Sequence, residues 1–171
     1  KALSVACEGA NEIKVKYGDL LLSVPLRADG TFDEKEEKIL NEFGNWMNIN
    51  KEAIYQTRPW KIFGEGPIAD KDVQLNAQGF NEWAYSKADA KEIRFTQTDK
   101  NLYATVLGWP EDGKILIRSL AEGNGLYPTK IGRVELLGYG KVSFTRTDKG
   151  LVVDIPAKSL KNIAPVLKIR K

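Results

Sequence analysis

Residues 93–109 have the sequence IRFTQTDKNLYATVLGW. Apolar and polar side chains alternate over residues 93–98 and again over residues 102–109, which is typical of strands with one buried face. Residues 99–101, Asp-Lys-Asn, are of the types that a reversing backbone favours, so the segment predicts a β-hairpin. The side chains expected to face the core are Ile93, Phe95, Leu102, Ala104 and Val106.

The same alternation continues to the end of the chain. Further strands are expected at residues 114–120, 131–137, 142–147, 151–155 and 165–170. Turn residues at 110–113 and 148–150 predict two more hairpins. The side chains expected inside are Ile115, Ile117, Leu151, Val153 and Ile155, and those expected in solvent are Arg94, Thr96, Arg118 and Asp154. Short strands with turns at about 8-to-12-residue spacing predict a mainly β fold, an antiparallel β-sandwich over residues 91–171.

A helix is expected ahead of the sandwich, at about residues 33–48. Two capping boxes fit its start, Thr31 with Glu34 or Asp33 with Glu36, and both place acids in the first turn, where the helix dipole favours them. Apolar side chains then recur at helical spacing and define one buried stripe. Its members are Ile39, Leu40, Phe43, Trp46 and Met47.

The segments on either side of this helix have different characters. Residues 19–24 contain the apolar run Leu20-Leu21-Leu22, which predicts a strand buried on both faces. Because a lone strand would expose an unpaired edge, residues 1–24 are expected to form a small antiparallel sheet that packs on the helical stripe. Residues 60–90 show no sustained period and contain several Pro and Gly, so we interpret them as a connector. The chain thus divides into residues 1–59, 60–90 and 91–171.

The composition excludes several kinds of chemistry. The 171 residues include no histidine, so this chain alone has no Ser-His-Asp or Cys-His nucleophile pair and no His-ligated metal. Its single cysteine excludes an internal disulfide and a cysteine zinc cluster. We therefore expect no metal and no cofactor, and any chemistry of this chain alone would use carboxylates, Lys or Tyr.

Charge and hydropathy argue against two classes of partner. The 26 Lys and Arg are interleaved with 23 Asp and Glu rather than gathered on one segment, so a nucleic-acid partner is not expected. The longest strongly apolar stretch, residues 20–26, is far shorter than the ~20 residues that cross a bilayer, so no membrane partner is expected either.

Several segments, taken in order, resemble glycoside hydrolase family 29, the α-L-fucosidases. They are LLLSVPLRADGT at 20–31, FGNW at 43–46, INKEAIYQTRPW at 49–60, FGEGP at 63–67, IRFT at 93–96, LYA at 102–104 and LGWP at 107–110. The resemblance implies that residues 1–59 are the end of a catalytic (β/α)8 barrel, with its last strand and helix, and that the C-terminal β-sandwich follows.

The resemblance also implies a function. The parent enzyme would hydrolyse terminal α-L-fucosyl linkages by a retaining mechanism, which needs two carboxyls about 5 Å apart. In the family these groups lie on earlier barrel strands, so no catalytic residue is assigned here. The chain is expected to be a structural, accessory part that meets fucosylated glycan through the parent enzyme and packs against the barrel or self-associates. The family further suggests a secreted or periplasmic location.

Loops after barrel strands form the active-site face of such barrels. Arg27 and Asp29 are therefore candidate substrate-binding residues. The alternative is that residues 28–30 form a simple turn and that Arg27 pairs with a carboxylate. This loop departs from the family, which commonly has Asn where Ser23 stands and Gly-Pro where residues 25–26 are Pro-Leu.

Two other functions fit the pattern. A carbohydrate-binding module would stack sugar rings on exposed aromatic side chains, for which Trp109 and Trp83 are the first candidates. The competing interpretation is that Trp109 packs beside its own turn, as large aromatic side chains commonly do. A protein-interaction domain would instead use a strand edge or the helix.

Overall fold

The computed structural model describes residues 23–71, 89–156 and 164–171. The sheet expected for residues 1–24 falls almost wholly outside these ranges, as does Trp83. Ser23 and Val24, its two described residues, are not in a strand.

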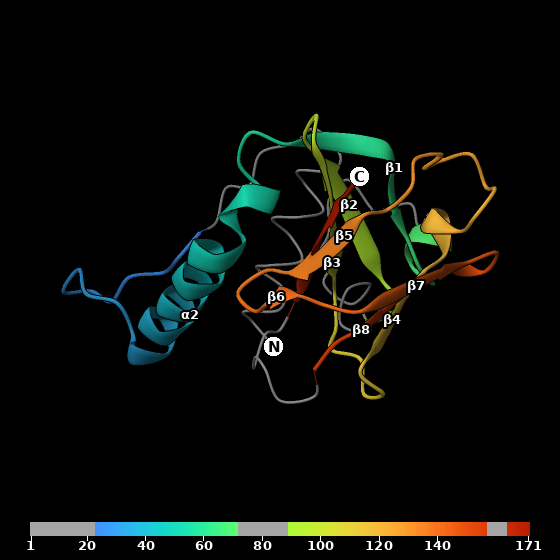
Figure 1. The fold of residues 1–171 in the computed structure, drawn as a ribbon. Coiled ribbons are helices and arrows are strands. Elements are labelled where there is room, and N and C mark those ends of the chain that lie inside the picture. Colours follow the sequence, from blue (N-terminus) through green and yellow to red (C-terminus); the bar gives the residue numbers. More distant parts are fainter. Residues whose placement is uncertain (1–22, 72–88, 157–163) are drawn as a thin grey trace.

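Two antiparallel sheets build the molecule (Figure 1). The large sheet has six strands in the order β1-β2-β3-β9-β5-β6, and the small sheet has three in the order β4-β8-β7. Strands of the large sheet are β1 (Arg58–Glu65), β2 (Ile93–Gln97), β3 (Asn101–Val106), β9 (Val166–Arg170), β5 (Arg133–Leu136) and β6 (Gly140–Lys141). Strands of the small sheet are β4 (Lys114–Ile117), β8 (Gly150–Asp154) and β7 (Phe144–Thr147). The predicted antiparallel β-sandwich is confirmed.

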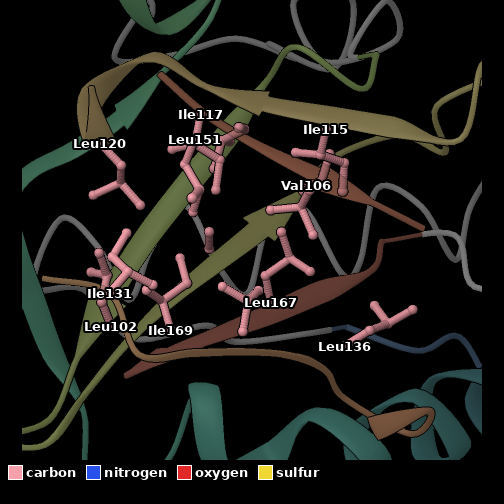
Figure 2. Packing of buried hydrophobic residues seen from close by; sticks show 14 of the residues in the cluster. Leu102, Val106, Ile115, Ile117, Leu120, Ile131, Leu136, Leu151, Leu167 and Ile169 are labelled. Atoms are coloured by element: carbon pink, nitrogen blue, oxygen red, sulfur yellow. The ribbon is translucent and has the colours of Figure 1, made fainter. Parts of the chain in front are cut away.

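The core lies between the two sheets. Figure 2 shows Val106, Leu167 and Ile169 of the large sheet pointing toward Ile115 and Leu151 of the small one. All ten side chains predicted to face inward are buried, none more than 5% exposed. The period-2 alternation therefore predicted the buried face of the four strands for which inward side chains were named.

Two of the three predicted hairpins are present. The chain reverses between β2 and β3, where Thr98 N–H donates to Asn101 O (2.9 Å), and between β7 and β8. The third prediction is wrong, because residues 110–113 carry the chain from β3 in one sheet to β4 in the other. The reason is that β3 already has β2 on one edge and β9 on the other, so β4 cannot pair with it.

The helix α2 (Glu34–Asn50) begins at Asp33, whose carboxylate accepts from Lys35 N–H (2.9 Å), and ends close to the predicted position. Its C-terminal part and the following 3-10 turn η1 (Lys51–Ala53) pack on the outer face of the large sheet. Trp46 is the anchor, because its ring is 4% exposed and its Nε1–H donates to Ala164 O (2.9 Å).

The prediction that Arg94 and Thr96 face solvent is wrong, because they are 1% and 2% exposed. Thr96 is covered by η1, where its Oγ1 donates to the carbonyl oxygen of Ala53 (2.7 Å), and Arg94 lies against Glu92 and the Phe63 ring of β1. Alternation shows that a face is polar but not that another element covers it. Arg118 and Asp154 do lie in solvent as predicted.

The interpretation of residues 60–90 as a connector is wrong for their first part. Residues 58–65 form β1, which pairs with β2 with a shift of register between Pro59 and Gly64. That irregularity breaks the alternation that would have indicated a strand. Trp60 of β1 is buried in the core, edge-on to Phe95 with ring centroids 5.0 Å apart.

Candidate functional site

Arg27 and Asp29, the predicted substrate-binding residues, lie in an exposed loop before α2. Asp29 Oδ1 accepts from the hydroxyl (2.7 Å) and the backbone N–H (3.0 Å) of Thr31, and these bonds lower the pKa of the Asp29 carboxyl. Arg27 Nη2 lies 3.1 Å from Asp33 Oδ2. Each side chain thus has a local partner. This arrangement fits the alternative interpretation, in which residues 28–30 form a simple turn and Arg27 pairs with a carboxylate. Contact of either residue with substrate stays a prediction.

Of the two candidates for sugar stacking, Trp109 lies within the described residues. It follows β3 and borders a groove of about 970 Å³. The ring is half-buried and packs against the sandwich core, as the competing interpretation expects. Charged residues form much of the rest of the lining, and several of them pair with each other or with a close neighbour. Arg118 Nη2 lies 2.7 Å from Asp70 Oδ2, and Lys114 Nζ lies 3.1 Å from Asp154 Oδ1. Sugar stacking on Trp109 therefore stays a prediction.

Two buried carboxylates beside this groove were missed by the sequence analysis. Glu65, at the end of β1, is 4% exposed, and Glu92, just before β2, is 1% exposed. Glu65 accepts from the backbone N–H groups of Arg118 and Ser119, both at 2.7 Å, and from the Ser119 hydroxyl. These bonds fix the start of the 3-10 turn η3 (Arg118–Leu120).

Glu92 is held in a similar way. Its carboxylate lies 2.9 Å from Arg94 Nη1 and accepts from the backbone N–H of Ile68, ahead of the 3-10 turn η2 (Ala69–Lys71). The Arg94 guanidinium also lies 5.7 Å from the centroid of the Phe63 ring. Because both buried carboxylates are engaged by backbone or guanidinium donors, their geometry suits fixing turns rather than attacking a substrate.

Two further properties hold for the described part of the chain. No three carboxylate or cysteine side chains there are grouped so that they could hold a metal ion. The helices within residues 23–71, 89–156 and 164–171 include none that combines the length and the apolar character needed to cross a bilayer.

Residues 87–170 match the family model described as the alpha-L-fucosidase C-terminal domain. These residues form an alpha-L-fucosidase C-terminal domain. The family resemblance predicted from the ordered segments is thereby confirmed.

Individual fucosidases are similar over a longer part of the chain. The plasma alpha-L-fucosidase of Rattus norvegicus is 29% identical over 145 residues, which are 84% of this chain and 26% of that protein. The tissue alpha-L-fucosidase of Macaca fascicularis is 30% identical over 139 residues, 81% of this chain and 24% of that protein. The chain therefore spans about a quarter of the length of these relatives.

The fold is also that of solved fucosidases. The crystal structure of the Thermotoga maritima alpha-fucosidase in complex with a mechanism-based inhibitor superposes with a TM-score of 0.69 at 24% identity. The superposition covers 99% of this chain and 34% of that chain. The likeness thus extends beyond the sandwich to α2.

Proposed function

We propose that this chain is the accessory, non-catalytic C-terminal part of an α-L-fucosidase. The parent enzyme would hydrolyse terminal α-L-fucosyl linkages, with its two catalytic carboxyls on a barrel that this chain supports. The observation that supports this most is the extent of the structural likeness, because one superposition takes in helix and sandwich together over 99% of the chain.

The surface of α2 is consistent with such a supporting role. Trp46, near the C-terminal end of α2, is anchored on the large sheet, whereas Ile39 and Leu40 are only partly buried. The N-terminal half of the helix extends away from both sheets (Figure 1). In the parent enzyme α2 would be the last helix of the barrel, and the other barrel elements would cover this apolar stripe.

The buried carboxylates are consistent with the non-catalytic part of the proposal. A retaining glycosidase needs one carboxylate free to attack the anomeric carbon and one carboxyl free to donate a proton. Glu65 and Glu92 are the buried carboxylates of the described residues, and both are committed to structural hydrogen bonds. The proposal extends to fucosylated glycan as the parent's substrate and to a secreted or periplasmic location.

The test compares two proteins on 4-nitrophenyl α-L-fucoside. One is the 171-residue chain, and the other is the product of the complete reading frame that encodes it. We expect nitrophenol from the second protein alone. Release of nitrophenol by the 171-residue chain would show that the chain is catalytic. If neither protein releases nitrophenol, the fucosidase assignment is wrong.

A further inference from the structure

A second groove lies at the opposite end of β3 from the Trp109 loop, between η1 and the β2–β3 turn. Its volume is about 650 Å³. Tyr55 and Gln56 line one wall, Asp99 and Asn101 line the other, and Glu52 and Tyr103 also contribute to the lining. None of these residues was singled out for a site by the sequence analysis.

Tyr55 supplies an open aromatic surface. The residue is 61% exposed, the largest fraction among the exposed large apolar and aromatic residues of the described chain. Its backbone is nevertheless fixed, because its N–H donates to Lys51 O (2.8 Å). An exposed ring on a fixed backbone can bind a flat, partly apolar ligand face without losing much conformational freedom on binding.

The next residue, Gln56, has a strained backbone. Its φ of 57° is the only positive φ of a non-glycine residue in the described ranges. Hydrogen bonds on either side maintain this conformation, since Thr57 Oγ1 donates to Ile54 O (2.9 Å) and Thr96 Oγ1 donates to Ala53 O (2.7 Å). Backbone strain that the surroundings enforce is concentrated at binding and catalytic sites.

The polar side chains of the groove are held in place by the sheet beneath. Glu52 accepts from the Tyr103 hydroxyl (3.0 Å) and pairs with Lys168 of β9. Asn101 Nδ2 donates to the same hydroxyl (3.3 Å). Burial, and then the bond to Glu52, raise the pKa of the Tyr103 phenol to about 12.

The opposite wall is fixed by an ion pair. Asp99 Oδ1 lies 2.6 Å from Arg58 Nη2, at the start of β1. Glu52 and Asp99 each keep further acceptor capacity beyond these contacts, because an ionised carboxylate has about four lone-pair sites. Gln56 and Asn101 add amide groups that both donate and accept.

The charges of the lining decide between ligand classes. Two lysines, Lys51 and Lys100, accompany the two carboxylates in the lining, and Lys168 and Arg58 pair with those carboxylates from outside it. A polycation would gain little beside these cations, and a phosphate would meet the Glu52 and Asp99 carboxylates, whereas a neutral ligand that both donates and accepts hydrogen bonds would match the groove. A pyranose ring has this character, because its C–H face can stack on an aromatic ring while its hydroxyls bond to amides and carboxylates.

We propose that the groove between Tyr55 and Asn101 binds a neutral saccharide, with a pyranose ring stacked on Tyr55 and hydroxyls bonded to Glu52, Gln56 and Asn101. Such a site goes beyond the accessory role, which needs no glycan contact from this chain. Only the choice of a fucose-bearing probe rests on the proposed function.

The experiment is a titration of the ¹⁵N-labelled 171-residue chain with 2′-fucosyllactose and with lactose, followed by NMR. We expect shifts at the Tyr55, Gln56 and Asn101 amides, with dissociation constants in the millimolar range. Tyr55→Ala should weaken binding by about tenfold or more, and Tyr55→Phe, which keeps the ring, should stay within about threefold of the unmodified chain. Tyr139→Ala is the matched control, because Tyr139 is also an exposed tyrosine (52%) and does not line the groove.

Several outcomes would overturn the proposal. The first is that neither sugar shifts any amide signal. The second is that the shifts centre on the Trp109 indole instead, and the third is that Tyr55→Ala and Tyr139→Ala weaken binding equally. Thermal melts of each variant show whether it is folded, and Asn101→Ala tests the same groove should Tyr55→Ala unfold. A failure here leaves the accessory function standing, because release of nitrophenol tests that function separately.

Discussion

The carboxylate of Glu65 and the backbone N–H of Ser119 are joined by a 2.7 Å hydrogen bond between residues 54 positions apart in the sequence. Glu65 ends the edge strand β1 of the large sheet, and Ser119 lies in η3, directly after β4 of the small sheet. Because the Ser119 hydroxyl and Arg118 N–H also donate to this carboxylate, one side chain fastens the two sheets together at the edge of the sandwich.

Glu65→Gln should destabilise the fold by about 1–3 kcal/mol, since an amide oxygen accepts more weakly than a carboxylate and its NH₂ group would face buried donors. The measurement is the free energy of unfolding from urea titration. Glu111→Gln, at an exposed position, is the matched control and should change this free energy by less than about 0.5 kcal/mol. Equal stability of the two variants would mean that Glu65 does not fasten the sheets.

The buried pair of Glu92 and Arg94 gives a second prediction. Arg94→Met should destabilise the protein by about 3–5 kcal/mol, because it leaves the Glu92 carboxylate buried beside backbone donors without its cation. Adding Glu92→Gln to Arg94→Met removes the unpaired charge and should recover part of that loss. Urea unfolding of the two single variants and the double variant measures this coupling. Simple additivity of the single effects would contradict it.

The sequence predicted those features of the fold that depend on residues close together in the chain, and it failed for those that depend on pairing between distant strands. The inward faces of β2, β3, β4 and β8 were predicted correctly from alternation, whereas the burial of Arg94 and Thr96 on the other face of β2 was not. Strand β1 was missed because its pairing with β2 is irregular between Pro59 and Gly64. The expected third hairpin was wrong because the pairing of β9 with β3 is decided by residues some 60 positions further along the chain.

The groove residues were harder to predict for the same reason. Nothing in the order of residues 51–57 shows that Gln56 has a positive φ, or that Tyr55 remains exposed beside the β2–β3 turn. Glu65 and Glu92 resemble ordinary surface carboxylates until their distant donors are known. By contrast, Trp109 was found by its residue type, and the structure places it beside a groove but half-buried against the core.

A pH prediction follows from Tyr103. Burial, and then the Tyr103 bond to Glu52, raise the pKa of this phenol from 10.0 to about 12. Between these pH values the unfolded chain has lost the phenolic proton and the folded chain retains it. Folding stability should therefore fall as pH rises from 10 to 12, by on the order of 2 kcal/mol for this group.

Tyr103→Phe isolates that contribution from the other groups that titrate at high pH. The variant should be less stable at pH 8 by about 1 kcal/mol, through loss of the bond to Glu52, and should lack the Tyr103 part of the decline. Urea unfolding at intervals from pH 8 to about 12 measures both proteins. Parallel stability curves for the two would show that Tyr103 titrates alike in the folded and unfolded chains.

Arg146 gives the last prediction, because one guanidinium holds the loop between η3 and β5. From β7 it donates to four backbone carbonyls, those of Leu120 (2.7 Å), Ala121 (3.3 Å), Tyr127 (2.6 Å) and Thr129 (2.9 Å). A lysine ammonium has no planar fork and cannot reproduce these directions. Arg146→Lys should therefore destabilise the fold by about 2–3 kcal/mol and increase amide hydrogen exchange in residues 121–130. Arg133→Lys replaces an exposed arginine and should do neither, so equal effects of the two variants would show that the carbonyl contacts do not stabilise the loop.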